Sequence, residues 1–339
     1  MKYQVLLTER IAPVGISMLE KKAHIVVAPS PGEADLLSLV DSADALIIRS
    51  TKLTIPVMEA GKNLKIIGRH GAGLDNIDLP AATRLGLPVV YTPEANSNAV
   101  AEHTIWAILH FAKGLSRAEK ALREGKFARE GSLPGLVHKL GFMTTELQSK
   151  KLALIGFGRV ARRVAEIARC FRMEVKAYDP LVDDDAFQAL SVSRAGTVEE
   201  AIQDADFVSL HVPYMKETHH LIGEKQLNNM KAASFLLNTS RGGVVDEEAL
   251  YRALEDKKIA GAALDVYEKE PPATDHPFLG LENTIATPHM AAMTDRSLTN
   301  VAVDVCKGVL DALEGEKPKF IANPTVWENR RGSSQQDRS

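Results

Sequence analysis

The strongest constraint on the fold of this chain is an alternation between short apolar runs and longer amphipathic stretches. In the first hundred residues, helix-like segments such as 13–23 and 31–43 separate runs rich in Val, Ile and Leu. These runs are YQVLLT, HIVVAP, ALIIRS, LKIIGR and LPVVYT. Such an alternation predicts an α/β unit with a mostly parallel, buried sheet.

The same alternation restarts at residue 151. A helical stretch over 97–125 precedes it and is long enough to bridge two domains. The new runs, whose number fits a Rossmann-type sheet, are KLALIGFG, EVKAYDP, DFVSLHV, SFLLNTS, GAALDV and TIATPH. A last helix is expected over 295–315, and the polar residues 327–339 are expected to form a disordered tail. The chain therefore predicts two α/β domains.

Composition excludes several classes of protein. A chain of 339 residues that is 45% hydrophobic can bury two cores, and a net charge of −3 gives no field that would gather nucleic acid or an anionic membrane. Cys170 and Cys306 support neither a disulfide framework nor a zinc cluster, so no metal site is expected. The start lacks the apolar core of a signal peptide, and no apolar run reaches membrane-spanning length. We expect a soluble, cytoplasmic protein.

A nucleotide-binding pattern opens the second series. In LIGFGRVA, Gly156, Gly158 and Ala161 form G-x-G-x-x-A, in which the glycines permit a tight turn and the close approach of a phosphate. The alternative is a purely structural glycine turn. Asp179 follows about twenty residues later, where a carboxylate accepts both ribose hydroxyls and repels the extra phosphate of NADP. The expected cofactor is NAD.

Three later stretches carry candidate catalytic groups. Arg241 follows an apolar run and can hold a carboxylate by two parallel hydrogen bonds, unless it is a surface arginine paired with Asp246 or Glu247. His289 follows the last run; a lone histidine is often structural, but one beside a carboxylate becomes an acid-base group near neutral pH. The carboxylates available are Asp265, Glu268 and Glu270. The sequence leaves open whether these side chains meet.

Together these residues resemble a known family. The segments GRHGAGLDNIDL, NSNAVAEHT, LIGFGRVA, YDP, LHVP, NTSRGGVVDEEAL, ALDVYEKEPP and TPHMA resemble those of the D-isomer specific 2-hydroxyacid dehydrogenases, in the same order and over nearly all of residues 1–325. The resemblance implies two Rossmann/flavodoxin-like domains with parallel sheets. The NAD-binding domain, 100–293, would be inserted into a discontinuous substrate domain, 1–99 and 294–326, with helices near 97–120 and 294–313 as the hinge.

The resemblance also implies roles for the candidate catalytic residues. Arg241 would bind the substrate carboxylate and the oxygen at C2, and His289 would be the general acid-base with Glu270 as its partner. Asp265 would face the nicotinamide edge, and Glu268 would be solvated. The reaction would transfer a hydride between NAD and C2 of a small 2-hydroxy or 2-oxo acid.

The resemblance further implies two sets of binding residues. At the NAD site it places Gly156, Gly158, Arg159, Val160, Asp179, Pro180, His211, Val212, Pro213, Thr218, Thr239, Ser240, Asp265, His289 and Ala291. At the substrate site it places Arg49, Ser50, Ala72, Gly73, Asn96 and Arg241.

Within the family, the sequence is most similar to the D-3-phosphoglycerate dehydrogenase branch. Arg49 and Ser50 fall where those enzymes approach a distal phosphate, although Arg49 could be an ordinary strand-end arginine. Departures from the branch include Met293, Arg296 and an insertion-like segment, 131–140. Hydroxypyruvate, glyoxylate or another small 2-oxo acid therefore remains an alternative substrate, while Glu270 argues against a formate dehydrogenase.

The given sequence ends without the regulatory domain of many members, so control by serine is not expected. An NAD(H)-sensing corepressor that binds peptides is the alternative from a different functional class. The resemblance implies a homodimer formed through the NAD-binding domain, with the segment 100–145 at the contact.

Overall fold

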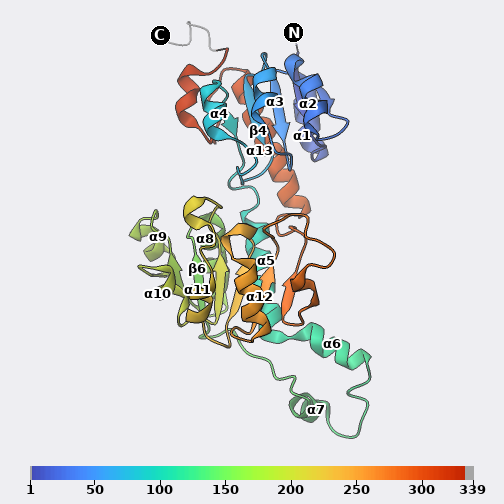
Figure 1. Ribbon diagram of the computed structural model, residues 1–339, viewed down its shortest axis with the longest axis vertical. Helices are drawn as coiled ribbons and strands as arrows, with labels where there is room; N and C mark the ends of the chain where they lie inside the picture. Colours follow the sequence, from blue (N-terminus) through green and yellow to red (C-terminus); the bar gives the residue numbers. More distant parts are fainter. Residues whose placement is uncertain (1, 333–339) are drawn as a thin grey trace. The chain divides into compact units, whose positions relative to one another are not determined.

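The computed structural model describes residues 2–332 and divides into two compact units (Figure 1). The first unit is formed by Met1–Ser97 and Ala292–Ser339, and the second by Asn98–Ala291. The domain boundaries predicted from the sequence lie between residues 99 and 100 and between residues 293 and 294. The units of the structure meet two residues earlier in each case, between 97 and 98 and between 291 and 292. Each unit has its own parallel sheet between layers of helices, so the predicted α/β fold class is confirmed.

The first unit contains a five-stranded sheet in the order β2-β1-β3-β4-β5, which is the flavodoxin-like order. All of its strand pairs are parallel. The strands are β1 (Tyr3–Leu7), β2 (Ala23–Val27), β3 (Ala45–Ile48), β4 (Ile66–Arg69) and β5 (Val89–Val90). Four of them lie within the apolar runs of the first hundred residues, and β2 begins one residue before its run.

Two hydrophobic clusters cover the faces of this sheet. Val5 and Leu7 of β1 pack with α1 (Pro13–Glu20) and α13 (Asp295–Leu313), while Leu6 packs toward the opposite face. The helices of that opposite face are α2 (Glu33–Leu39), α3 (Ile55–Ala60) and α4 (Leu79–Arg84), with a 3-10 turn, η1 (Val40–Ser42), after α2. Successive strand residues point to opposite faces, so an unbroken apolar run supplies both layers.

The second unit contains a seven-stranded parallel sheet in the order β12-β11-β10-β9-β6-β7-β8, the arrangement of a Rossmann fold. Its strands are β6 (Lys151–Ile155), β7 (Glu174–Tyr178), β8 (Ser193–Arg194), β9 (Phe207–Leu210), β10 (Phe235–Asn238), β11 (Gly261–Leu264) and β12 (Thr284–Ala286). Six of them lie within the predicted runs. The seventh, β8, has two exposed residues at the sheet edge and therefore carries no apolar signal.

Helices cover both faces of this second sheet. One face packs against α5 (Ser97–Lys113) and α8 (Arg159–Cys170). The other packs against α10 (Val198–Ile202), α11 (Glu224–Asn229) and α12 (Glu247–Glu255). The short α9 (Asp184–Ala189) and the 3-10 turns η2 (Lys216–Thr218), η3 (Gly242–Val244) and η4 (Pro277–Gly280) complete the unit.

The structure corrects two expectations about individual segments. The single helix expected over 97–125 is broken at Gly114, whose φ of 54° ends α5 before α6 (Leu115–Arg123) begins. The segment 131–140 contains a short helix, α7 (Leu133–Lys139). The expected tail starts too early, because Trp327 is buried in η5 (Pro324–Asn329).

Beyond η5, the Arg331 side chain donates hydrogen bonds to the carbonyl oxygens of Leu85 and Gly61. The rest of the tail, 333–339, lies outside the described residues. Among the helices of residues 2–332, none is both long and apolar enough to cross a membrane.

Candidate active site

Most candidate residues of the second unit follow the carboxyl ends of its parallel strands. Gly156 follows β6, Asp179 follows β7, His211 follows β9, Thr239 follows β10 and Asp265 follows β11. The carboxyl ends of parallel strands meet at one edge of a sheet, which is where open α/β sheets bind ligands. The alternation in the sequence thus brings these residues to one edge.

The glycine turn after β6 has the geometry that a dinucleotide requires. Gly156 has a φ of 89°, and a Cβ there would lie 2.7 Å from the carbonyl oxygen of His211, so only glycine fits. A Cβ on Gly158 would meet no atom within 4 Å, which leaves open space beside the backbone. Helix α8 begins at Arg159 with no side-chain hydrogen bond at its N-cap. Its first amide groups can therefore bind a phosphate.

Asp179 is fixed beside this turn. Its Oδ2 accepts a hydrogen bond from the amide of Phe157 at 2.8 Å, and its Oδ1 accepts one from the amide of Leu181 at 2.9 Å. The carboxylate therefore has a set orientation at the end of β7, next to the glycine turn. A partly exposed carboxylate at this position suits the hydroxyls of a ribose, so the residues present fit a dinucleotide.

The segment after β9 packs onto the glycine turn. The Cγ1 atom of Val212 lies 3.0 Å from the position of a Cβ on Gly156. The imidazole of His211 hydrogen-bonds through Nε2 to Ser209 Oγ at 2.9 Å, and burial lowers its pKa, so it is neutral at pH 7. Thr218 is occupied within the segment, since its hydroxyl donates to the carbonyl oxygen of Pro213 at 2.7 Å.

Asn238, at the end of β10, organises the loop that carries Arg241. This side chain is 1% exposed; its amide donates to the Arg241 carbonyl oxygen at 2.8 Å, and its Oδ1 accepts from the amide and hydroxyl of Ser240. The Arg241 guanidinium donates to the carbonyl oxygen of Ser240 at 2.7 Å. Thr239 Oγ1 lies 3.4 Å from Thr104 Oγ1 of α5. Asn238 was not among the predicted site residues, although a polar residue that ends a buried apolar run was the available signal.

Asp265 holds the turn that contains His289. Its carboxylate is 1% exposed and accepts hydrogen bonds from Thr287 Oγ1 at 2.6 Å and from the amides of Met290 and Ala291, both at 2.8 Å. The expected position of Asp265 at the nicotinamide edge stays a prediction, and these hydrogen bonds order the turn formed by residues 287–291. They support a His289 backbone with a φ of 51°, a conformation that L-residues rarely adopt.

The side chains of Glu270 and His289 meet. Glu270 Oε2 lies 2.8 Å from His289 Nδ1, and Glu270 Oε1 accepts a hydrogen bond from the amide of Tyr267 at 3.1 Å. Burial acts to raise the pKa of Glu270, but the hydrogen bond and charge of His289, the Tyr267 amide and the positive charge of Arg241 outweigh it and hold that pKa below its usual value. The electrostatic influence of Arg241 on this carboxylate indicates that the three predicted catalytic residues share one region of the second unit.

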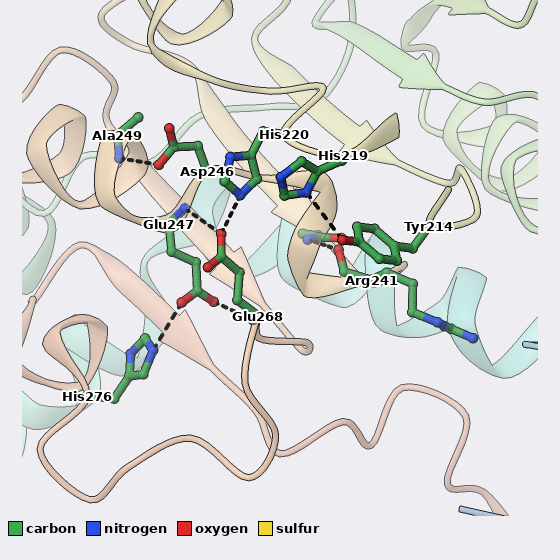
Figure 2. Close-up of polar contacts among 10 residues, drawn as sticks. Tyr214, His219, His220, Arg241, Asp246, Glu247, Ala249, Glu268 and His276 are labelled. Carbon is green, nitrogen blue, oxygen red and sulfur yellow. Dashed lines mark hydrogen bonds and ion pairs between the residues drawn. The ribbon is translucent and has the colours of Figure 1, made fainter. Parts of the chain in front are cut away.

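The two acids that were the alternative partners of Arg241 make other contacts. The Asp246 carboxylate caps α12 by accepting a hydrogen bond from the amide of Ala249 at 2.9 Å. Glu247 interacts with His276 and with the backbone of Glu268 (Figure 2). Figure 2 also shows that the Arg241 side chain extends away from these two acids.

The family resemblance implied that Glu268 is solvated, but its side chain makes two polar contacts. Its Oε1 lies 2.8 Å from His220 Nε2 and accepts a weaker bond from the amide of Glu247 at 3.4 Å. Glu268 nevertheless keeps 39% of its side chain exposed. His220, Glu247 and His276 were not predicted as members of this network, because they come from separate segments of the chain.

The remaining candidates of the substrate site belong to the first unit. Arg49 and Ser50 follow β3, and Arg49 Nη2 lies 3.6 Å from Met293 Sδ. Ser50 donates from its amide and its hydroxyl to the carboxylate of Glu9, at 2.9 Å and 2.8 Å. The other candidates, Ala72, Gly73 and Asn96, are partly exposed and lie in the loop after β4 and in the turn before α5.

Other candidates of the NAD site lie at the start of α8 or in the turns already described. Arg159 and Val160 form the first turn of α8, and Pro180 is exposed beside Asp179. Within residues 2–332, no group of three or more His, Cys, Asp or Glu side chains could hold a metal ion.

Comparison with known proteins identifies the family. Residues 105–291 match the family model described as "D-isomer specific 2-hydroxyacid dehydrogenase, NAD binding domain". A D-3-phosphoglycerate dehydrogenase of Methanocaldococcus jannaschii is 37% identical over 97% of this chain and 61% of its own length. A glyoxylate reductase of Thermofilum pendens is 35% identical over 96% of each chain.

A solved structure gives the same result. The crystal structure of D-lactate dehydrogenase from Aquifex aeolicus, complexed with NAD and lactic acid, is 29% identical and has a TM-score of 0.80, covering 96% of this chain and 98% of its own. The chain spans between 58% and 61% of the length of the first three D-3-phosphoglycerate dehydrogenases it matches. Both the family model and these similarities agree with the motifs in the sequence. The chain therefore belongs to the D-isomer specific 2-hydroxyacid dehydrogenase family.

Proposed function

We propose that this protein is an NAD-dependent oxidoreductase that interconverts a small D-2-hydroxy acid and its 2-oxo acid. The observation that carries the proposal is the pairing of His289 with Glu270, in a region that the charge of Arg241 also reaches. An acid-base imidazole beside a guanidinium is what the reduction of a 2-oxo acid needs, because a proton must reach the C2 oxygen while the carboxylate is held.

His289 would exchange the proton through Nε2. Its Nδ1 faces Glu270, which fixes the orientation of the ring. The side chain is 49% exposed in the second unit, so the ring remains accessible to a substrate. In the reducing direction the imidazolium donates its proton to the C2 oxygen, and in the oxidising direction the neutral ring accepts it. The bound nicotinamide supplies or accepts the hydride.

Arg241 would orient the substrate. Its guanidinium can bind the carboxylate by two hydrogen bonds and stabilise the charge that develops on the C2 oxygen. The backbone of Ala72 and Gly73, together with Asn96, would complete the carboxylate site. On this proposal the first unit is the substrate domain and the second is the NAD-binding domain.

NAD rather than NADP is the proposed cofactor. The Asp179 carboxylate is oriented by two backbone amides at the end of β7. It can accept hydrogen bonds from both ribose hydroxyls, and its charge repels a 2′-phosphate.

D-3-phosphoglycerate is the first candidate substrate, because several relatives with about 37% identity carry the name D-3-phosphoglycerate dehydrogenase. Hydroxypyruvate and glyoxylate form the second candidate. The bonds from Ser50 to Glu9 favour them, since a distal phosphate at Ser50 would have to displace a carboxylate from the same donors.

The test is NADH oxidation with a panel of 2-oxo acids that have or lack a distal phosphate. We expect turnover of at least one member of the panel. NADH binding without turnover of any member would contradict the enzymatic proposal and favour an NAD(H)-sensing binding protein.

We also propose a homodimer whose contact includes α6 and α7, which extend away from the second sheet in Figure 1. This segment exposes large apolar side chains: Leu115, Leu122, Leu133 and Met143 are each at least 60% exposed. Exposed large apolar side chains of this kind are typical of an interface, and a second copy of the chain offers the same side chains. Light scattering at micromolar concentration should give twice the mass of one chain, and a monomer would refute the proposal.

A further inference from the structure

The segment that carries Glu270 has no regular secondary structure of its own. Between the end of β11 at Leu264 and the start of η4 at Pro277, the chain forms neither a helix nor a strand. A carboxylate that must stay 2.8 Å from His289 therefore depends on contacts that other elements make with this segment.

Glu247 supplies two such contacts from the first turn of α12. Its Oε1 accepts a hydrogen bond from the amide of Glu268 at 2.9 Å, and its Oε2 lies 3.3 Å from His276 Nε2 (Figure 2). These contacts lie on either side of Glu270 along the chain. The side chains of Glu247 and His276 are only 19% and 15% exposed, so water competes weakly for the pair.

The backbone of Tyr267 and Glu268 also packs against the loop that contains Arg241. A Cβ on Gly242 would lie 1.9 Å from the carbonyl carbon of Tyr267 and 2.3 Å from the amide nitrogen of Glu268. The amide of Tyr267 in turn donates to Glu270 Oε1. Residues 267–268 thus lie between Gly242, the neighbour of Arg241, and the carboxylate of Glu270. Glu247 holds this backbone in place by accepting a hydrogen bond from the amide of Glu268.

We infer that Glu247 is a positioning residue, which acts on the proposed reaction by holding the segment that keeps Glu270 against His289. The inference rests on the proposed function. Within residues 2–332, no hydrogen bond or ion pair joins Glu247 to His289 or to the Arg241 guanidinium, so its effect passes through the segment 266–276.

Capping of α12 does not account for Glu247. The helix already has a cap, since Asp246 Oδ1 accepts from the amide of Ala249. An acidic residue in the first turn also interacts favourably with the helix dipole, but Glu248 shares that property. The Glu248 side chain is 82% exposed and pairs with Arg252 of the same helix. Glu248 is therefore the matched control for the loss of one negative charge in this turn.

The experiment compares Glu247→Ala, Glu247→Gln and Glu248→Ala in the full chain. We expect Glu247→Ala to lower kcat at least tenfold while the KM for NADH changes less than threefold, because the cofactor residues are untouched. Glu247→Gln keeps one acceptor for the Glu268 amide, so it should lie between wild type and Glu247→Ala. Glu248→Ala should resemble wild type.

A double-mutant cycle separates positioning from general loss of structure. If Glu247 acts through Glu270, adding Glu247→Ala to Glu270→Gln should lower kcat less than twofold further. A full additional tenfold loss would overturn the inference. Where Glu247→Ala does not fold, the same cycle is run with Glu247→Gln, with the same criterion set by that variant's own single loss.

Amide hydrogen exchange gives a readout that does not depend on activity. Exchange in residues 266–276 should be faster in Glu247→Ala than in wild type and unchanged in Glu248→Ala. Unchanged exchange in the first variant would overturn the inference. If the wild-type protein turned over no 2-oxo acid, the proposed function would be overturned instead. The exchange result would still show whether Glu247 stabilises the segment 266–276.

Discussion

Glu270 Oε2 lies 2.8 Å from Nδ1 of His289, a residue that follows the next strand of the same sheet. The pair leaves Nε2 as the nitrogen that can exchange a proton with a substrate. Asp265 holds the turn around His289 by accepting hydrogen bonds from the amides of Met290 and Ala291. The imidazole of His289, the proposed acid-base group, and the turn that carries it are thus oriented by two carboxylates that come from one loop.

Replacing His289 by Ala should lower kcat at least about a hundredfold, because no other group would supply the proton to the C2 oxygen. The dissociation constant of NADH, measured by fluorescence titration, should change little. His24→Ala, at an exposed position of β2, is the control and should retain wild-type turnover. Near wild-type turnover in His289→Ala would remove this residue from the mechanism.

The pairing should also appear in the pH dependence of stability. The pKa of Glu270 is held below its ordinary value of 4.5, so ionised Glu270 stabilises the folded state at neutral pH. This contribution is complete above the unfolded pKa and is lost as the pH falls through the lowered folded pKa. The free energies of unfolding of wild type and Glu270→Gln, measured with urea, should therefore differ near pH 7 and become equal in acid. If the difference in the free energy of unfolding grew as the pH fell, the lowered pKa of Glu270 would be contradicted.

Replacing Asp179 by Ser should relax the choice of cofactor. Removal of the carboxylate removes both the ribose acceptor and the repulsion of a 2′-phosphate. The ratio of kcat/KM for NADPH to that for NADH should rise by about tenfold or more, since each 1.4 kcal/mol corresponds to a factor of about ten. Asp185→Asn, an exposed change on α9, should leave the ratio unaltered. An unchanged ratio in Asp179→Ser would show that cofactor choice is made elsewhere.

Much of this fold could be predicted because both parallel sheets are covered on two faces, so their strands are short unbroken apolar runs. The edge strand β8 could not, since Ser193 and Arg194 are exposed. The break between α5 and α6 depends on a left-handed Gly114 within an otherwise helical pattern. At the site, strand ends and motifs indicated Arg241, Glu270 and His289. The contacts of Asn238 lie within three residues along the chain, and the polar residue at the end of an apolar run was a signal for them. The contacts of Glu247 were not predictable, because they join the start of α12 to the separate segment 268–276.

Replacing Arg241 by Ala should reduce kcat/KM for the 2-oxo acid by the equivalent of roughly 1.5–3 kcal/mol, the range for hydrogen bonds to charged groups. Arg241→Lys should recover only part of the loss, because an ammonium group cannot form two parallel bonds to a carboxylate. Steady-state kinetics in the reducing direction provide the measurement. Unchanged kcat/KM in Arg241→Ala would rule out substrate binding by this residue.

Replacing Glu9 by Gln should change which substrates are accepted. The carboxylate of Glu9 takes both the amide and the hydroxyl of Ser50, so a phosphate group at that position would meet a negative charge only a few ångströms away. Removing the charge should raise kcat/KM for a phosphorylated 2-oxo acid about tenfold relative to glyoxylate. Glu33→Gln, an exposed change at the start of α2, controls for the altered net charge. If wild type already prefers the phosphorylated substrate and Glu9→Gln does not increase that preference, Glu9 does not exclude a distal phosphate, and Arg49 and Ser50 bind it with the carboxylate in place.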